Sequence, residues 1–238
     1  MNAAFLARME DVLAVYERAD DPRFPVVCFA ERPCVLHGQP VAPLPPVPAQ
    51  PAVGEQPAVG EQPTKAGRPR RESSTYVRQG TACLLAAFEP GTGQRLVEVS
   101  ARRTGADYGR FVRVLAAAYP QAEKIVLVQD NGNTHTDAAF YQHRPAAQAR
   151  ALAARFEVHY TPKNASWLNT VELERSAIAR QCLHQRIPTR DELAAHIGAC
   201  VAERNARRAT VKWQFSLDKA REKLTRHYQK VCIDNSPD

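Results

Sequence analysis

Short apolar segments of strand length recur along this sequence, and their order limits the folds that the chain can adopt. Residues 82–89 and 95–100 form two such segments, and Pro90-Gly-Thr-Gly93 between them is typical of a hairpin turn. Three further strands are expected at residues 25–31, 125–128 and 156–160. An antiparallel hairpin, combined with later strands that alternate with helices, predicts an α/β domain with a mixed five-stranded sheet flanked by helices.

The helical segments expected between and after these strands follow the spacing of apolar residues. The clearest helix begins after Thr104, a suitable capping residue. Its apolar side chains recur at i, i+3, i+4 and i+7 and are Tyr108, Phe111, Val112 and Leu115. Helices are also expected at residues 1–20, at 145–155 and over most of the chain after Leu168.

A proline-rich segment interrupts this pattern after the first strand. It contains a tandem duplication, in which Pro51-Ala-Val-Gly-Glu-Gln56 is repeated directly at residues 57–62. Because proline lacks a backbone donor, we expect an extended loop over residues 38–74. The predicted organisation is an N-terminal helix and linker at 1–24, one domain at 25–230 and a tail at 231–238.

The net charge of +7 favours a nucleic-acid partner, because Lys and Arg neutralise phosphates. No run approaches the roughly 18 apolar residues that a membrane span needs, and the N-terminus does not resemble a signal peptide. A cytoplasmic protein without membrane contact is therefore expected. The six cysteines form no C-x-x-C pair, which favours buried free thiols over disulfides or a zinc site.

Three acidic residues stand where functional groups gather in α/β sheets, near the carboxyl ends of strands. Asp130 follows the strand expected at 125–128, Glu31 ends the first strand, and Glu172 begins the long C-terminal helix. Each also has a simpler interpretation. Asp130 can shape a turn, Glu172 can form a capping box with Asn169, and Glu31 can be solvated.

Two long motifs resemble the catalytic core of bacterial insertion-sequence transposases related to the Tc/mariner superfamily. They are Leu127-Val-Gln-Asp-Asn-Gly-Asn-Thr-His135 and Tyr160-Thr-Pro-Lys-Asn-Ala-Ser-Trp-Leu-Asn-Thr-Val-Glu172. Shorter segments similar to the same family are Arg78–Thr81, Gln181–Leu183 and Trp213–Leu224. The resemblance runs from about Phe5 to Tyr228 and is broken by the proline-rich segment. It implies a ribonuclease H-like fold with three carboxylates that hold two divalent metal ions.

By position in these motifs, Asp130 matches the second carboxylate and Glu172 the third. The first is an aspartate directly before a glutamate that ends the first strand, and this chain has Ala30 there, followed by Glu31. Because side chains alternate along a strand, Ala30 shares a face with Cys28, whereas Glu31 points to the other face. Glu31 is therefore expected to give at most indirect support.

The resemblance implies Mg²⁺ or Mn²⁺ as cofactor and DNA as substrate. Two metal ions can activate the attacking oxygen and stabilise the leaving one. The resemblance further implies that water first frees a 3′-hydroxyl at the transposon end, and that this hydroxyl then attacks target DNA. With Ala30 in the first position, we expect weak metal binding and reduced activity. Two alternatives are a non-catalytic descendant that binds DNA or a partner, and a nuclease that cuts without joining. A homodimer is the family's expected assembly.

Residues that flank the proposed site are candidates for DNA contact. They are His135, Lys163, Trp167, Asn169, Arg175 and Arg180. Packing is the alternative for Trp167, and a solvated face is the alternative for the arginines, including Arg204. Related transposases usually carry a helix-turn-helix region before the core, and this chain begins close to the core. Little sequence-specific DNA binding is therefore expected of the chain by itself.

Overall fold

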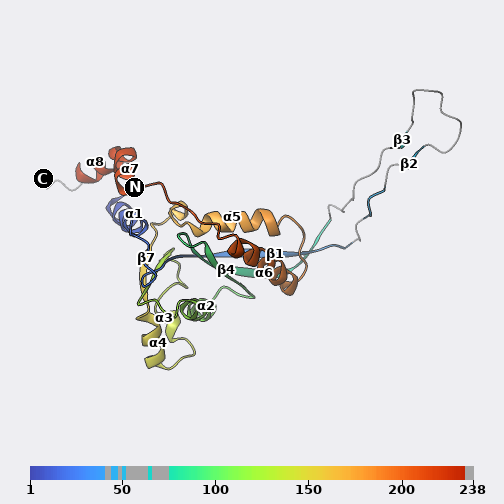
Figure 1. Ribbon diagram of the computed structural model, residues 1–238, viewed down its shortest axis with the longest axis horizontal. Coiled ribbons are helices and arrows are strands. Elements are labelled where there is room, and N and C mark those ends of the chain that lie inside the picture. Colours follow the sequence, from blue (N-terminus) through green and yellow to red (C-terminus); the bar gives the residue numbers. More distant parts are fainter. Residues whose placement is uncertain (41–43, 48–49, 52–63, 66–74, 234–238) are drawn as a thin grey trace.

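A mixed five-stranded sheet forms the centre of the protein (Figure 1). A computed structural model describes residues 1–40, 44–47, 50–51, 64–65 and 75–233. The strands are β1 (Val26–Gly38), β4 (Val77–Glu89), β5 (Gln94–Ser100), β6 (Ile125–Gln129) and β7 (Phe156–Tyr160). Their order is β5-β4-β1-β6-β7; β4 runs antiparallel to β1 and β5, whereas β1, β6 and β7 are parallel. The predicted mixed sheet is confirmed.

The antiparallel ladder between β1 and β4 is longer than predicted. The sequence favoured strands that end at Glu31 and begin at Ala82, but β1 continues to Gly38 and β4 already begins at Val77. The sequence hid this extension because it contains Pro33. This proline is compatible with the sheet, since β6 pairs only with residues 26–28 of β1 and requires no backbone donor from Pro33.

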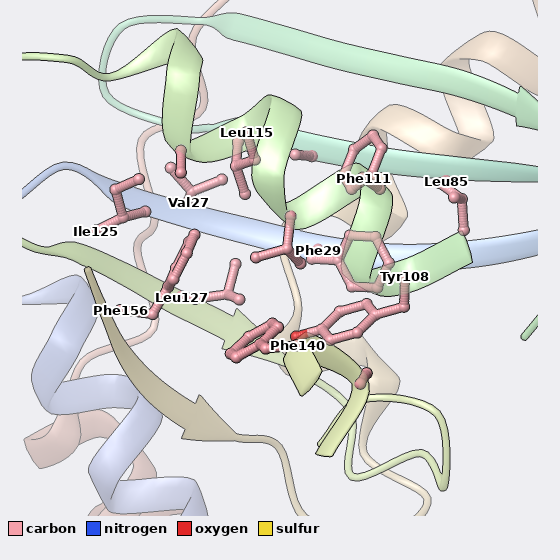
Figure 2. Close-up of a cluster of buried hydrophobic side chains, with 14 of the residues drawn as sticks. Val27, Phe29, Leu85, Tyr108, Phe111, Leu115, Ile125, Leu127, Phe140 and Phe156 are labelled. Carbon is pink, nitrogen blue, oxygen red and sulfur yellow. The ribbon is translucent and has the colours of Figure 1, made fainter. Parts of the chain in front are cut away.

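One face of the sheet is covered by α2 (Gly105–Ala118), α3 (Ala138–Tyr141) and α4 (Ala146–Ala153). The predicted apolar stripe of α2 is buried against the strands (Figure 2). Thr104 and Asp107 form a capping box at the start of this helix, as the sequence suggested for Thr104. The core on this face, called here the first cluster, includes Val27, Phe29, Leu85, Tyr108, Phe111, Leu115, Ile125, Leu127, Phe140 and Phe156.

The opposite face carries the N-terminal helix and the C-terminal helices. They are α1 (Ala3–Tyr16), α5 (Val171–Cys182), α6 (Arg190–Ala206) and α7 (Leu217–Lys223), and α8 (Thr225–Ile233) follows α7. A short 3₁₀ helix, η1 (Ser166–Leu168), precedes α5. The second cluster, on this face, includes Leu6, Met9, Val12, Leu13, Cys28, Ala30, Val126, Val128, Leu168 and Val171. Because α1 contributes side chains to this core, it packs against the strands. The domain boundary expected after residue 24 stays a prediction.

Most of the proline-rich segment lies outside the described residues, including most of the duplicated sequence. Within the segment, the structure describes β2 (Gln50–Pro51) and β3 (Thr64–Lys65), which pair antiparallel. None of the helices that the structure describes combines the length and apolar character needed to cross a bilayer. Among the described cysteines, four free thiols are buried, those of Cys28, Cys83, Cys182 and Cys200, whereas the free thiol of Cys34 is partly exposed.

Candidate active site

Asp130 lies directly after β6, at the carboxyl end of the parallel strands. Its side chain is 53% exposed. One carboxylate oxygen, Oδ1, accepts a hydrogen bond of 3.1 Å from the Gly132 backbone amide. The turn-shaping role is therefore present, and it leaves the carboxylate accessible to solvent at the end of the sheet.

Ala30 lies in the adjacent strand β1 and is buried at 4% exposure. It belongs to the second cluster together with Val126 and Val128 of β6, whereas Phe29 belongs to the first cluster. The predicted alternation of faces is thus confirmed along this part of β1. Position 30 contributes a methyl group to an apolar surface on the face that carries α5.

Glu31 points to the opposite face, as predicted, and is not solvated. Its side chain is 2% exposed, and its Oε1 lies 2.9 Å from Nε2 of His135. The other oxygen contacts Arg103, whose side chain is half exposed. Neither Oε1 nor Nε2 has a hydrogen bond among the described residues, so their contact is an ion pair without hydrogen-bond geometry. Glu31 cannot replace a carboxylate at position 30 from this place.

His135 links the two carboxylates. Its Nδ1 lies 2.5 Å from Oδ1 of Asp130, on the side of the ring opposite the Glu31 contact. Burial by itself would lower the pKa of His135, but the contacts with Asp130 and Glu31 outweigh it and raise that pKa to about 9. The hydrogen bond from His135 in turn lowers the pKa of Asp130. At neutral pH the ring of His135 is therefore a cation.

The ring of His135 is enclosed within the protein, and this burial does not support the predicted DNA contact, which stays a prediction. The ring packs edge-on against Phe29, with centroids 5.1 Å apart, and lies 5.0 Å from the ring of Tyr108. Sequence spacing did not reveal Glu31 as a partner of His135, or Arg103 as a partner of Glu31, because Glu31 comes from β1 and Arg103 from the loop before α2.

Glu172 lies in the first turn of α5 and is partly exposed. Its Oε1 accepts a hydrogen bond of 2.5 Å from Nη1 of Arg175. The capping box suggested by Asn169 and Glu172 is not formed, because α5 begins after Thr170 without a side-chain cap. Arg175, a predicted DNA contact, is therefore engaged with Glu172 in this structure.

Asn169 is buried and fastens the start of α5 to the sheet. Its Nδ2 donates a hydrogen bond of 2.8 Å to the backbone carbonyl of Phe29, directly before Ala30. Its own backbone carbonyl accepts from the amide of Glu172 at 3.0 Å. A neighbouring contact, from the Thr170 hydroxyl to the Cys28 thiol at 2.9 Å, adds to this attachment. Asn169 is therefore a structural link between β1 and α5, and its burial does not support the predicted DNA contact.

Replacing Asn169 with alanine is expected to lower the free energy of unfolding by about 1–3 kcal/mol, because it leaves a buried carbonyl without this partner. Urea denaturation followed by circular dichroism measures the change. Ser166→Ala serves as the control, since Ser166 is exposed on the preceding turn. Equal stability of the two variants would contradict the structural role of Asn169.

The remaining predicted DNA contacts lie at the surface. Lys163 and Arg180 are exposed. Trp167 is 47% exposed, and its ring packs against that of Phe215, with centroids 5.8 Å apart. These positions leave the predicted contacts open to a ligand.

The residues present do not complete the metal centre that the resemblance implies. The carboxylates of Asp130 and Glu172 supply hard oxygen donors suited to Mg²⁺ or Mn²⁺. The first position supplies only the buried methyl of Ala30. Within the described part of the chain, no group of three His, Cys, Asp or Glu side chains is arranged to hold a metal ion. A pair of metal ions therefore does not fit this donor set.

Comparison with known proteins defines the class of this chain. Residues 52–194 match the family described as DDE superfamily endonuclease. The match spans more than half of the chain, so the protein belongs to this family. Strand β1, with Ala30 and Glu31, lies outside the matched residues.

Among solved structures, the chain resembles Mos1 transposase. The Mos1 strand transfer complex matches with a TM-score of 0.50 and 15% identity, over 98% of this chain and 61% of that one. The Mos1 paired-end complex with the left transposon end matches with a TM-score of 0.49 and 16% identity, over 99% and 64% of the two chains. This chain thus spans less than two thirds of the Mos1 chains. The likeness to the strand transfer complex confirms the predicted ribonuclease H-like fold, and a search of curated proteins found no match.

Proposed function

We propose that this chain is the catalytic domain of a DDE transposase whose DNA cleavage and strand transfer are weakened at Ala30. The observation that carries the proposal is the placement of Asp130 and Glu172. Asp130 follows β6, and Glu172 lies in the first turn of α5, shortly after Asn169, which is hydrogen-bonded to β1 beside Ala30. The family and the fold support the transposase class, and the two sequence motifs supply the carboxylate positions.

The proposed substrates are transposon ends and target DNA, in line with the net charge of +7. The exposed Lys163, Trp167 and Arg180 are suited to contact phosphates or stack on bases near the site. Mg²⁺ or Mn²⁺ is the proposed cofactor, although Ala30 leaves a metal pair without its first carboxylate ligand. A homodimer and a cytoplasmic location stay predictions.

Ala30→Asp tests this function directly. We expect Mn²⁺-dependent nicking of a supercoiled plasmid to rise at least about 100-fold, because a further metal ligand stabilises the transition state by several kcal/mol. The same variant should join a labelled duplex with a free 3′-hydroxyl to the plasmid. Ala30→Asn is the matched control, since it has the same shape and no charge.

The outcomes separate the alternatives. Nicking without joining would indicate a nuclease of the same fold. If neither reaction appears, the site assignment is wrong or the chain has become a non-catalytic binding protein. Adding Asp130→Asn to the Ala30→Asp variant should abolish the gain, because it removes the second carboxylate.

A further inference from the structure

The side chain of His135 is held at both ring nitrogens and packed against two aromatic rings. Nδ1 contacts Asp130 and Nε2 contacts Glu31, while the rings of Phe29 and Tyr108 pack against it. Rotation of the ring would break both charged contacts and displace two buried aromatic rings. The orientation of the ring is therefore fixed by its surroundings.

The backbone of His135 is held as well. Its carbonyl accepts hydrogen bonds of 3.3 Å from Nε2 of Gln129 and from the hydroxyl of Tyr160. Its amide donates to the carbonyl of Gly132 at 3.0 Å. The loop after β6 thus folds back, so that His135 lies beside the carboxyl end of β6 and its ring contacts Asp130.

Glu31 secures the ring from the side away from Asp130. Its carboxylate is 2% exposed, with one oxygen in contact with Arg103 and the other 2.9 Å from Nε2 of His135. Because a buried carboxylate is costly without polar partners, this contact keeps Glu31 and the Nε2 edge of the ring together. The glycine at position 132 leaves space for this arrangement, because a Cβ there would lie 3.0 Å from both Asp130 Oδ1 and His135 Nδ1.

We infer that His135 is a positioning residue that fixes the direction of the Asp130 carboxylate, and that Glu31 holds its ring in place from the opposite side. The inference rests on the proposed function only for the catalytic role of Asp130. It assigns Glu31 a task that does not require it to reach the vacated first position. Partners that orient a metal ligand commonly change metal affinity about 10–100-fold when they are removed.

Two neutral variants of His135 separate positioning from general packing. The amide nitrogen of asparagine corresponds to Nδ1, which faces Asp130, whereas that of glutamine corresponds to Nε2, which faces Glu31. The readout is hydrogen exchange of the Gly132 amide in the metal-free chain, because this amide donates to Asp130 Oδ1. We expect His135→Gln to speed this exchange about tenfold and His135→Asn to change it less than about threefold.

The amide of Leu127 within β6 is the internal control and should keep its protection in both variants. Equal exchange at Gly132 in His135→Gln and His135→Asn would overturn the inference, whether both are fast or both are slow. A merely structural role predicts that outcome, since both variants remove the same packing against Phe29 and Tyr108.

Mn²⁺ binding gives a second test, in which failure of the proposed function can be told apart from failure of the role inferred for His135. Mn²⁺ affinity is determined by calorimetry for Ala30→Asp combined with each variant at position 135. The inference predicts at least about tenfold weaker binding with glutamine than with asparagine. If Ala30→Asp binds no Mn²⁺, the proposed function fails, and the Gly132 exchange still decides the role of His135.

Discussion

Ala30→Asp is expected to lower stability in the absence of metal ions and to make stability depend on Mn²⁺. Ala30 is buried among Cys28, Val126 and Val128, so a carboxylate there loses hydration without gaining a partner. We expect the free energy of unfolding in EDTA to fall by about 1–3 kcal/mol. Saturating Mn²⁺, at about 100 times its dissociation constant, should restore about 2.7 kcal/mol. Thermal denaturation at several Mn²⁺ concentrations measures both effects.

The unchanged chain and the Ala30→Asn variant are the controls for this experiment. Asparagine also places a polar group in the apolar slot, so its stability in EDTA should fall too, but Mn²⁺ should not restore it. The response to Mn²⁺ should vanish when Asp130→Asn is added to Ala30→Asp. A Mn²⁺ response of equal size in Ala30→Asn would show that the metal binds elsewhere and that position 30 does not face the other two carboxylates.

The parts of the site that lie within single elements could be predicted from sequence. Alternation along β1 correctly placed Ala30 and Glu31 on opposite faces, because a strand fixes side-chain direction by its period of two. The position of Asp130 at the end of β6 followed from the apolar run before it. The apolar stripe on α2 could also be predicted, because it depends only on spacing within one helix, and its residues are buried as expected.

The parts that depend on contacts between distant segments could not be predicted. Asn169 resembled a helix-capping residue, yet its side chain bonds to Phe29, which is 140 residues away in the sequence. His135 resembled a surface residue near a catalytic motif, and only the fold brings Glu31 to its other edge. Short polar motifs leave such choices open, because the same side chain can satisfy a local or a distant partner.

Glu174 illustrates the same limit and supports a second large prediction. Its sequence position predicted no role, but its buried carboxylate forms ion pairs with Arg95 of β5 and Arg204 of α6. Burial raises the pKa of Glu174, but hydrogen bonds from the two arginines outweigh this effect and keep the pKa below its usual value. Arg204, considered for phosphate contact, is thus committed to joining α6 to α5.

Arg95 is itself almost fully buried, and its position depends on this carboxylate. Its guanidinium also donates to the backbone carbonyls of Gly93 and Ala209 and lies over the ring of Phe88, 4.7 Å from the centroid. The network therefore ties β5 to the helices that cover one end of the sheet. Removing Glu174 leaves the charge of Arg95 buried with no carboxylate beside it.

Glu174→Ala is expected to lower the free energy of unfolding by about 3–5 kcal/mol, the usual cost of leaving a buried charge unpaired. Urea denaturation measures the loss. The free energy of unfolding of Glu174→Gln should lie between those of the unchanged chain and Glu174→Ala, because glutamine keeps a hydrogen-bond acceptor without the charge. The control is Glu203→Ala, which breaks an exposed ion pair with Arg207 on α6 and should cost less than about 1 kcal/mol. If Glu174→Ala were no more destabilising than Glu203→Ala, the buried network would contribute nothing to holding α5, and with it Glu172, against the sheet.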